Sequence, residues 1–161
     1  MKKKAYLILS LFLLIFINEC GGYKPIFSTT NLQFKISDHL IEGNQVLGKK
    51  IYSKLYSLSK SSKDNQSVRN IDIFINVSKE KKGTVKDGAG KILEYKITLN
   101  TEIRVKDFLT NEEILNNTIT LSTNYNVQDQ YSETVKLENK STEIIIENIY
   151  QELLVKLSQS I

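Results

Sequence analysis

Few side chains of this 161-residue sequence could take part in acid–base, nucleophilic or metal chemistry. A single Cys, Cys20, excludes an internal disulfide and any zinc cluster built from several thiolates. The only His, His39, follows Ser37 and Asp38, but three neighbours on one loop cannot easily reach the geometry of a catalytic triad. We therefore expect His39 to lie in a turn before the first helix. We predict that the protein is not an enzyme and has no metal site.

The position of Cys20 suggests a chemical role for its thiol. Lys2, Lys3 and Lys4 precede an apolar run over 5–17, which is too short to cross a bilayer but has the length of a signal-peptide core. Cys20 follows shortly after this run. The arrangement resembles the bacterial lipoprotein signal, in which the Cys thiolate takes up a diacylglyceryl group. An ordinary signal peptide and an uncleaved N-terminal anchor with an incidental Cys are the two alternatives.

These features divide the chain into a signal peptide at 1–19, a lipidated tether at 20–31 and a single domain at 32–161, a length typical of one domain. Loss of 1–19 would lower the net charge from +4 to +2, since 19 basic and 17 acidic side chains would remain. So small an excess gives no indication of nucleic-acid binding. Gly21 after the Cys points to the outer membrane, by analogy with enterobacterial sorting.

A second group that could do chemistry is a set of five lysines in the glycine-containing stretch 79–91. We expect this stretch to be the most flexible part of the domain. One interpretation is a solvated loop without a ligand. The other is a mobile set of cations for an anionic ligand at a membrane, because Lys is an effective point-charge partner for phosphate. The five are Lys79, Lys81, Lys82, Lys86 and Lys91.

Hydrophobic periodicity predicts the elements that would position these residues. Alternation of apolar and polar side chains indicates strands, and apolar side chains three or four residues apart indicate helices. The resulting order is strand, helix, three strands and helix, which predicts an α+β two-layer sandwich with two helices on one face of a mixed four-stranded sheet. The last two strands should form an antiparallel hairpin. The strands are expected at 32–37, 71–78, 95–106 and 115–125. The helices are expected at 44–59 and from near Ser132 or near Ser141 to the C-terminus, since both serines can serve as N-caps.

Three segments of the sequence resemble the lipopolysaccharide-assembly lipoproteins of the LptE type. The segment 20–27, CGGYKPIF, is similar to the start of alphaproteobacterial members, with one extra Gly. In 77–105, a basic glycine-containing stretch leads through Glu94 and Tyr95 into a long alternating strand, as in the family. The segment 124–132 contains NYN and then YS, and with the final amphipathic helix it is similar to the C-terminal part of these proteins.

The resemblance implies a non-enzymatic outer-membrane lipoprotein on the periplasmic face, anchored through Cys20 and free of cofactors. Members of this family plug the β-barrel LptD, and the pair inserts lipopolysaccharide into the outer leaflet. Large barrels have polar interiors that are often plugged. The five lysines are then candidates for contact with lipopolysaccharide. A free periplasmic lipid- or peptidoglycan-binding lipoprotein without a barrel is the alternative. The candidate partner-facing side chains form one polar face of the strand predicted at 95–106, namely Lys96, Thr98, Asn100, Glu102, Arg104 and Lys106.

Overall fold

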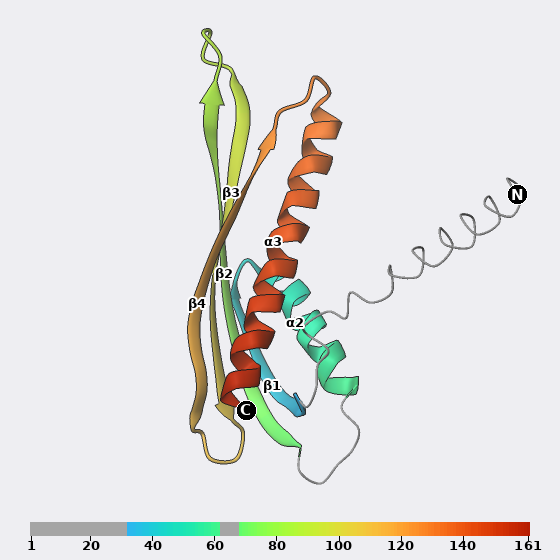
Figure 1. The fold of residues 1–161 in the computed structure, drawn as a ribbon, viewed down its shortest axis with the longest axis vertical. Coiled ribbons are helices and arrows are strands. Elements are labelled where there is room, and N and C mark those ends of the chain that lie inside the picture. The colour runs from blue at the N-terminus through green and yellow to red at the C-terminus, as the bar shows by residue number, and fades with distance from the viewer. Residues whose placement is uncertain (1–31, 62–67) are drawn as a thin grey trace, which may run out of the picture. The chain divides into compact units, whose positions relative to one another are not determined.

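A computed structural model describes residues 32–61 and 68–161 (Figure 1). The predicted signal peptide, Cys20 and the tether lie outside the described residues. The element order is strand, helix, three strands and helix, so the predicted α+β fold is confirmed. The elements are β1 (Phe34–Gly43), α2 (Gln45–Ser61), β2 (Arg69–Lys86), β3 (Ile92–Asp107), β4 (Glu113–Asn126) and α3 (Tyr131–Ser160).

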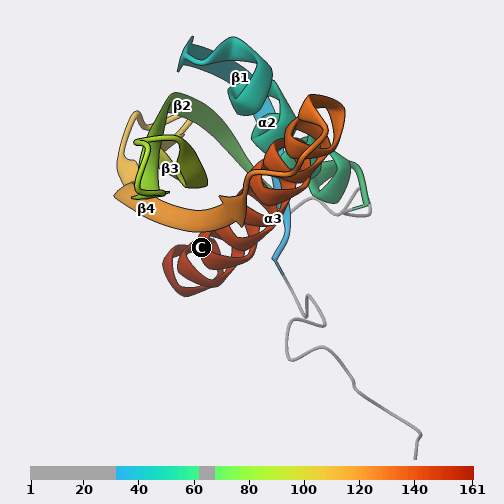
Figure 2. The same ribbon diagram turned by 90° about the horizontal axis from the view of Figure 1, so that it is seen from above.

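The four strands form one mixed sheet in the order β1-β2-β3-β4. β1 and β2 are parallel, whereas β2–β3 and β3–β4 are antiparallel pairs. A parallel pair needs a crossover, and α2 supplies it. Seen from above, α2 and α3 lie on the same side of the sheet (Figure 2). The predicted two-layer sandwich and the hairpin of the last two strands are therefore confirmed.

The hydrophobic core lies between this side of the sheet and the two helices. Alternate residues of β2 and β3 are buried there because successive side chains of a strand point to opposite faces. α2 contributes side chains four residues apart, as its predicted amphipathic face requires. The fully buried aliphatic side chains include Ile71, Ile75, Ile97, Leu99, Ile103, Ile51, Leu55, Ile146, Ile149 and Leu153. No helix of the described part of the chain is long and apolar enough to cross a membrane.

The stretch 79–91 is not the flexible loop that its glycines and lysines suggested. β2 continues to Lys86, and only the turn between Asp87 and Lys91 separates it from β3. The Asp87 side chain accepts hydrogen bonds from the N–H groups of Ala89 and Lys91, which closes the turn. The prediction failed because backbone pairing with β3 continues where the side chains become polar on both faces. This hairpin extends past the last paired residue of β4 (Figure 1).

Two further predictions are corrected at β1 and α3. β1 extends to Gly43, so His39 lies in a strand and not in a turn, and its ring stacks on Tyr52 at a centroid distance of 4.1 Å. A bulge between Ile36 and Asp38 shifts the alternation, which explains the early predicted end of the strand. α3 is one continuous helix from Tyr131 to Ser160, so the predicted start near Ser132 is confirmed and the alternative start near Ser141 is wrong. Its N-cap is Gln130. The two predicted N-caps, Ser132 and Ser141, both lie within the helix.

Candidate functional site

The polar residues predicted on one face of β3 all lie on the open side of the sheet, which neither helix covers (Figure 2). Their neighbours on the adjacent strands are polar as well. Asn100 lies between Ser78 of β2 and Thr120 of β4, and Glu102 lies between Asn76 and Thr118. The predicted face is therefore part of a surface that spans three strands. Its β3 members are Lys96, Thr98, Asn100, Glu102, Arg104 and Lys106.

The centre of this open face is built mainly from amides and hydroxyls. The Thr120 hydroxyl donates a hydrogen bond to Oδ1 of the Asn100 side chain at 3.4 Å. A shallow hollow of about 130 Å³ lies beside them. Such side chains can both donate and accept hydrogen bonds with a polar partner.

A larger hollow, of about 340 Å³, lies on the same open face over β1, β2 and β3. Leu40 is 55% exposed at its edge, and the Arg104 guanidinium stacks on the Phe74 ring at 4.0 Å. Arg104 also forms an ion pair with Glu102, with 3.2 Å between the Nε and Oε1 atoms. The sequence analysis did not single out Leu40 or Phe74. Phe74 could have been noticed in the sequence, because it is an apolar residue on the otherwise polar strand face that contains Asp72 and Asn76.

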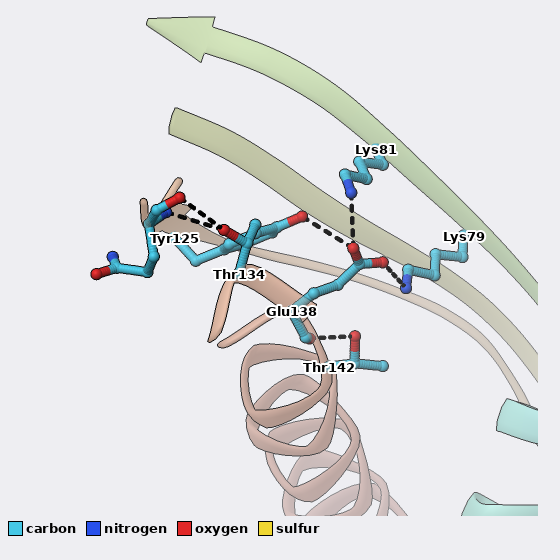
Figure 3. A network of polar contacts seen from close by, with 7 residues as sticks. Lys79, Lys81, Tyr125, Thr134, Glu138 and Thr142 are labelled. Atoms are coloured by element: carbon cyan, nitrogen blue, oxygen red, sulfur yellow. Dashed lines mark hydrogen bonds and ion pairs between the residues drawn. The ribbon is translucent and has the colours of Figure 1, made fainter. Parts of the chain in front are cut away.

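The five lysines of 79–91 do not form one group. Lys79 and Lys81 point to the helical side of the sheet, toward Glu138 of α3 (Figure 3). The other three lysines form no ion pair within the described residues. Lys82 lies on the open face opposite Lys96, where two like charges are cross-strand neighbours. Lys86 ends β2 and Lys91 precedes β3, so both lie at the hairpin turn.

Glu138 is the centre of a polar network that joins α3 to β2 and β4 (Figure 3). Its Oε1 accepts a hydrogen bond from Lys79 Nζ at 2.8 Å. Its Oε2 accepts bonds from Lys81 Nζ at 2.6 Å and from the Tyr125 hydroxyl at 3.0 Å. Lys81 Nζ also lies 4.3 Å from the centroid of the Tyr95 ring, a cation–π distance. Sequence reasoning missed Glu138, although it lies four residues from Thr134 and Thr142, both buried on α3.

The network shifts the protonation equilibria of its members. Burial alone would raise the pKa of Glu138, but hydrogen bonds from Lys79, Lys81 and Tyr125 outweigh it and hold the pKa at about 2. Burial alone would lower the pKa of Lys81, but hydrogen bonds with Glu138 and Tyr125 raise it well above its ordinary value. Lys79 and Lys81 are therefore compensated structural cations. Lys82, Lys86 and Lys91 remain the cations that could meet an anionic ligand.

Comparisons with known proteins relate this chain to others through its fold. No family model and no curated protein sequence matches it. A crystal structure from Caulobacter crescentus CB15, of a protein provisionally called a lipoprotein, is 12% identical with a TM-score of 0.57, covering 77% of this chain and 88% of that one. The solution structure of an uncharacterized lipoprotein B from Nitrosomonas europaea is 15% identical with a TM-score of 0.56, covering 80% and 91%.

These similarities place the chain in a class defined by architecture, the two-layer sandwich in which two helices cover one face of a mixed four-stranded sheet. Solved proteins that carry the name lipoprotein share this fold. At such low identity the similarity establishes the fold alone.

Proposed function

We propose that this protein is an outer-membrane lipoprotein of the LptE type. It would be anchored through Cys20, fill and help to assemble an LptD-type β-barrel, and take part in the insertion of lipopolysaccharide into the outer leaflet. One observation carries the proposal: a domain with the fold of proteins called lipoproteins follows a sequence whose only Cys comes just after a short apolar run. The barrel partner and the role in lipopolysaccharide insertion are proposed from the resemblance of segments 20–27, 77–105 and 124–132 to the LptE type.

The open face of the sheet supports the role of a plug. Large outer-membrane barrels have polar interiors. Amides and hydroxyls such as those of Asn76, Asn100 and Thr120 can exchange hydrogen bonds with polar side chains and loops inside a barrel. The helices complete the apolar core on the other side of the sheet, so this face needs no further cover for the domain to fold.

The β2–β3 hairpin supports contact with lipopolysaccharide, which carries phosphates and acyl chains. Lys82, Lys86 and Lys91 lie near its tip without ion pairs in the described part of the chain, so they could bind phosphate as point charges. Val85 and Leu93 are 45% and 42% exposed in the same region and could contact acyl chains. The hairpin thus combines the two chemistries that this ligand needs.

Site-specific photo-crosslinking in intact cells tests the barrel contact. A crosslinking amino acid at Asn100, on the open face, should capture a large outer-membrane barrel. The matched control is the same amino acid at Asn148, an exposed position of α3, which should capture much less. If neither position captures a barrel in cells that contain the lipidated protein, the plug role is wrong. A free lipid- or peptidoglycan-binding lipoprotein would then be the better description.

A further inference from the structure

We propose that the turn between β3 and β4, residues 108–111, inserts its apolar side chains into the surface of the lipid bilayer and so forms a second membrane contact beside the N-terminal anchor. The proposal rests on the N-terminal membrane attachment of the proposed function and is independent of the barrel. It is carried by the exposure, the rigidity and the position of this turn.

Two adjacent apolar side chains at the turn are unusually exposed. Leu109 is 80% and Phe108 is 49% exposed. Single exposed apolar residues are common on protein surfaces, but contiguous apolar surface marks contact with a partner or a membrane. Phe and Leu are among the residues that membrane-surface segments bury at the boundary between headgroups and acyl chains.

The turn is held in one conformation by the residue that precedes it. Asp107 Oδ1 accepts hydrogen bonds from the N–H groups of Leu109 at 2.9 Å and Thr110 at 3.0 Å. Asp107 Oδ2 accepts a bond from Arg69 Nε at 2.8 Å. Asn111 adopts the left-handed conformation, with φ 59°, and its N–H bonds to the Asp107 carbonyl. The exposed pair is thus presented by a fixed turn, so little ordering is needed when it meets a surface.

The turn lies at the end of the sheet from which the chain leads back to Cys20. Phe108 N–H bonds to the Asn70 carbonyl, and Asn70 pairs with Lys35 near the start of β1. The turn is therefore about two strand spacings, or about 10 Å, from the β1 backbone. Figure 1 shows the β3–β4 turn, the start of β1 and the C-terminus at the same end of the described domain.

The length of the preceding chain orients this end toward the membrane. The 13 residues from Gly21 to Gln33 can span at most about 45 Å when fully extended. β2 alone has 18 residues, which corresponds to about 60 Å. A chain attached to the bilayer near Cys20 therefore brings the end with the turn within reach of lipid more readily than the end with the β2–β3 hairpin.

The charges around the turn select the kind of lipid. Arg69 compensates Asp107, and Lys106 is the cross-strand partner of Glu113. Glu112 forms no ion pair within the described residues, so the surroundings carry a small negative excess. A zwitterionic surface such as phosphatidylethanolamine suits this turn better than an anionic one, because like charges repel.

The experiment uses the absence of Trp from the sequence. In the full-length protein, Leu109→Trp makes the turn the only source of tryptophan fluorescence, and its high exposure keeps the substitution from disturbing the fold. The protein is reconstituted into vesicles of phosphatidylcholine and phosphatidylethanolamine, with and without brominated acyl chains. The matched control is Tyr131→Trp, because Tyr131 is 82% exposed at the start of α3, toward the other end of the sheet.

We expect bromine to quench the emission of L109W at least about twofold and the emission of Y131W hardly at all. Phe108→Trp should be quenched like L109W. Equal, weak quenching of all three variants overturns the proposal. The assay contains no barrel, so failure to find a barrel in cells would remove the plug role and leave this result unaffected. Conversely, unquenched L109W beside a barrel that co-purifies would overturn this inference alone.

Discussion

Glu138 shows how much one carboxylate contributes to the tertiary structure. It binds Lys79, Lys81 and Tyr125 and so connects α3 with two strands. Lys81 and Glu138 are 57 residues apart in the sequence. Periodicity can place each residue on a face of its own element, but it cannot say which lysine meets which carboxylate. The ion pairs could therefore not be predicted from the sequence. For the same reason the sequence could not show that Lys79 and Lys81 pair with Glu138, whereas Lys82, Lys86 and Lys91 form no ion pair within the described residues.

The network predicts a pH-dependent difference between the wild type and Glu138→Gln. Above pH 4.5, the ordinary pKa, the ionised carboxylate contributes fully, and the variant should lower the free energy of unfolding by about 2 kcal/mol. As the pH falls toward about 2, the unfolded state takes up a proton before the folded state does, so the wild type loses this contribution. Denaturant unfolding of both proteins between pH 7 and pH 2 measures the difference.

Two comparisons sharpen this test. A hydrogen bond from Arg69 also holds the pKa of Asp107 at about 2, but Asp107 is present in both proteins and its effect cancels in the difference. Glu133→Gln changes an exposed carboxylate in the first turn of the same helix and should have a small effect. If the free energies of unfolding of E138Q and the wild type differed by the same amount at every pH from 7 to 2, the ionised Glu138 carboxylate would not be the stabilising group.

Thr101 offers a stabilising substitution. Its side chain is fully buried between the apolar positions of β3, and its hydroxyl has no hydrogen-bond partner within the described residues. Thr101→Val replaces this hydroxyl with a methyl group of similar size, and should raise the free energy of unfolding by about 1 kcal/mol. Thermal unfolding against Thr118→Val, an exposed control on the open face, checks this. A lower melting temperature for T101V would mean that the hydroxyl has an unrecognised partner.

Element by element, the sequence predicted the types and order of the helices and strands more reliably than their ends. The clean alternation of 95–106 marked β3 because one of its faces is polar throughout. β1 was predicted too short because the bulge after Ile36 interrupts the alternation of apolar and polar side chains from which the strand was predicted. The part of β2 beyond Ser78 was missed because its own side chains are mostly polar on both faces, so this part of the strand has no hydrophobic period.

The connection between β1 and α2 depends on Gly43. Gly43 has a φ of 66°, and a Cβ there would meet the Val77 carbonyl oxygen, which belongs to the backbone and cannot move away easily. Gly43→Ala should therefore lower the free energy of unfolding by about 1 to 3 kcal/mol. Gly88→Ala is the control, since a Cβ there has open space. Equal unfolding free energies for both variants would refute this explanation of the connection.

In the β2–β3 hairpin, the lysines at the turn can be replaced without disturbing the ion pairs of Lys79 and Lys81 with Glu138. Lys86→Ala with Lys91→Ala should weaken binding to lipopolysaccharide roughly fivefold to tenfold and leave stability unchanged. Lys49→Ala with Lys140→Ala removes the same charge from exposed helical positions and serves as the control. Binding to labelled lipopolysaccharide micelles gives the readout. Equal losses in both double variants would indicate attraction by overall charge instead of contact at the hairpin.

For the whole molecule, the two-layer sandwich followed from the sequence because each strand and helix shows one apolar face that must be covered. The sequence also predicted which face of β3 is left uncovered, because its polar residues alternate with apolar ones and therefore lie on one face. The hollow around Phe74 and Arg104 did not follow, because it is formed by side chains of three strands whose register the sequence does not state.

The most direct test of the account is a purification of the C-terminally tagged protein from native membranes in mild detergent, with mass spectrometry of the proteins that accompany it. The account predicts one large outer-membrane β-barrel in stoichiometric amount. Recovery of the protein alone from the detergent-solubilised membranes would contradict the plug role and favour a lipoprotein that acts without a barrel.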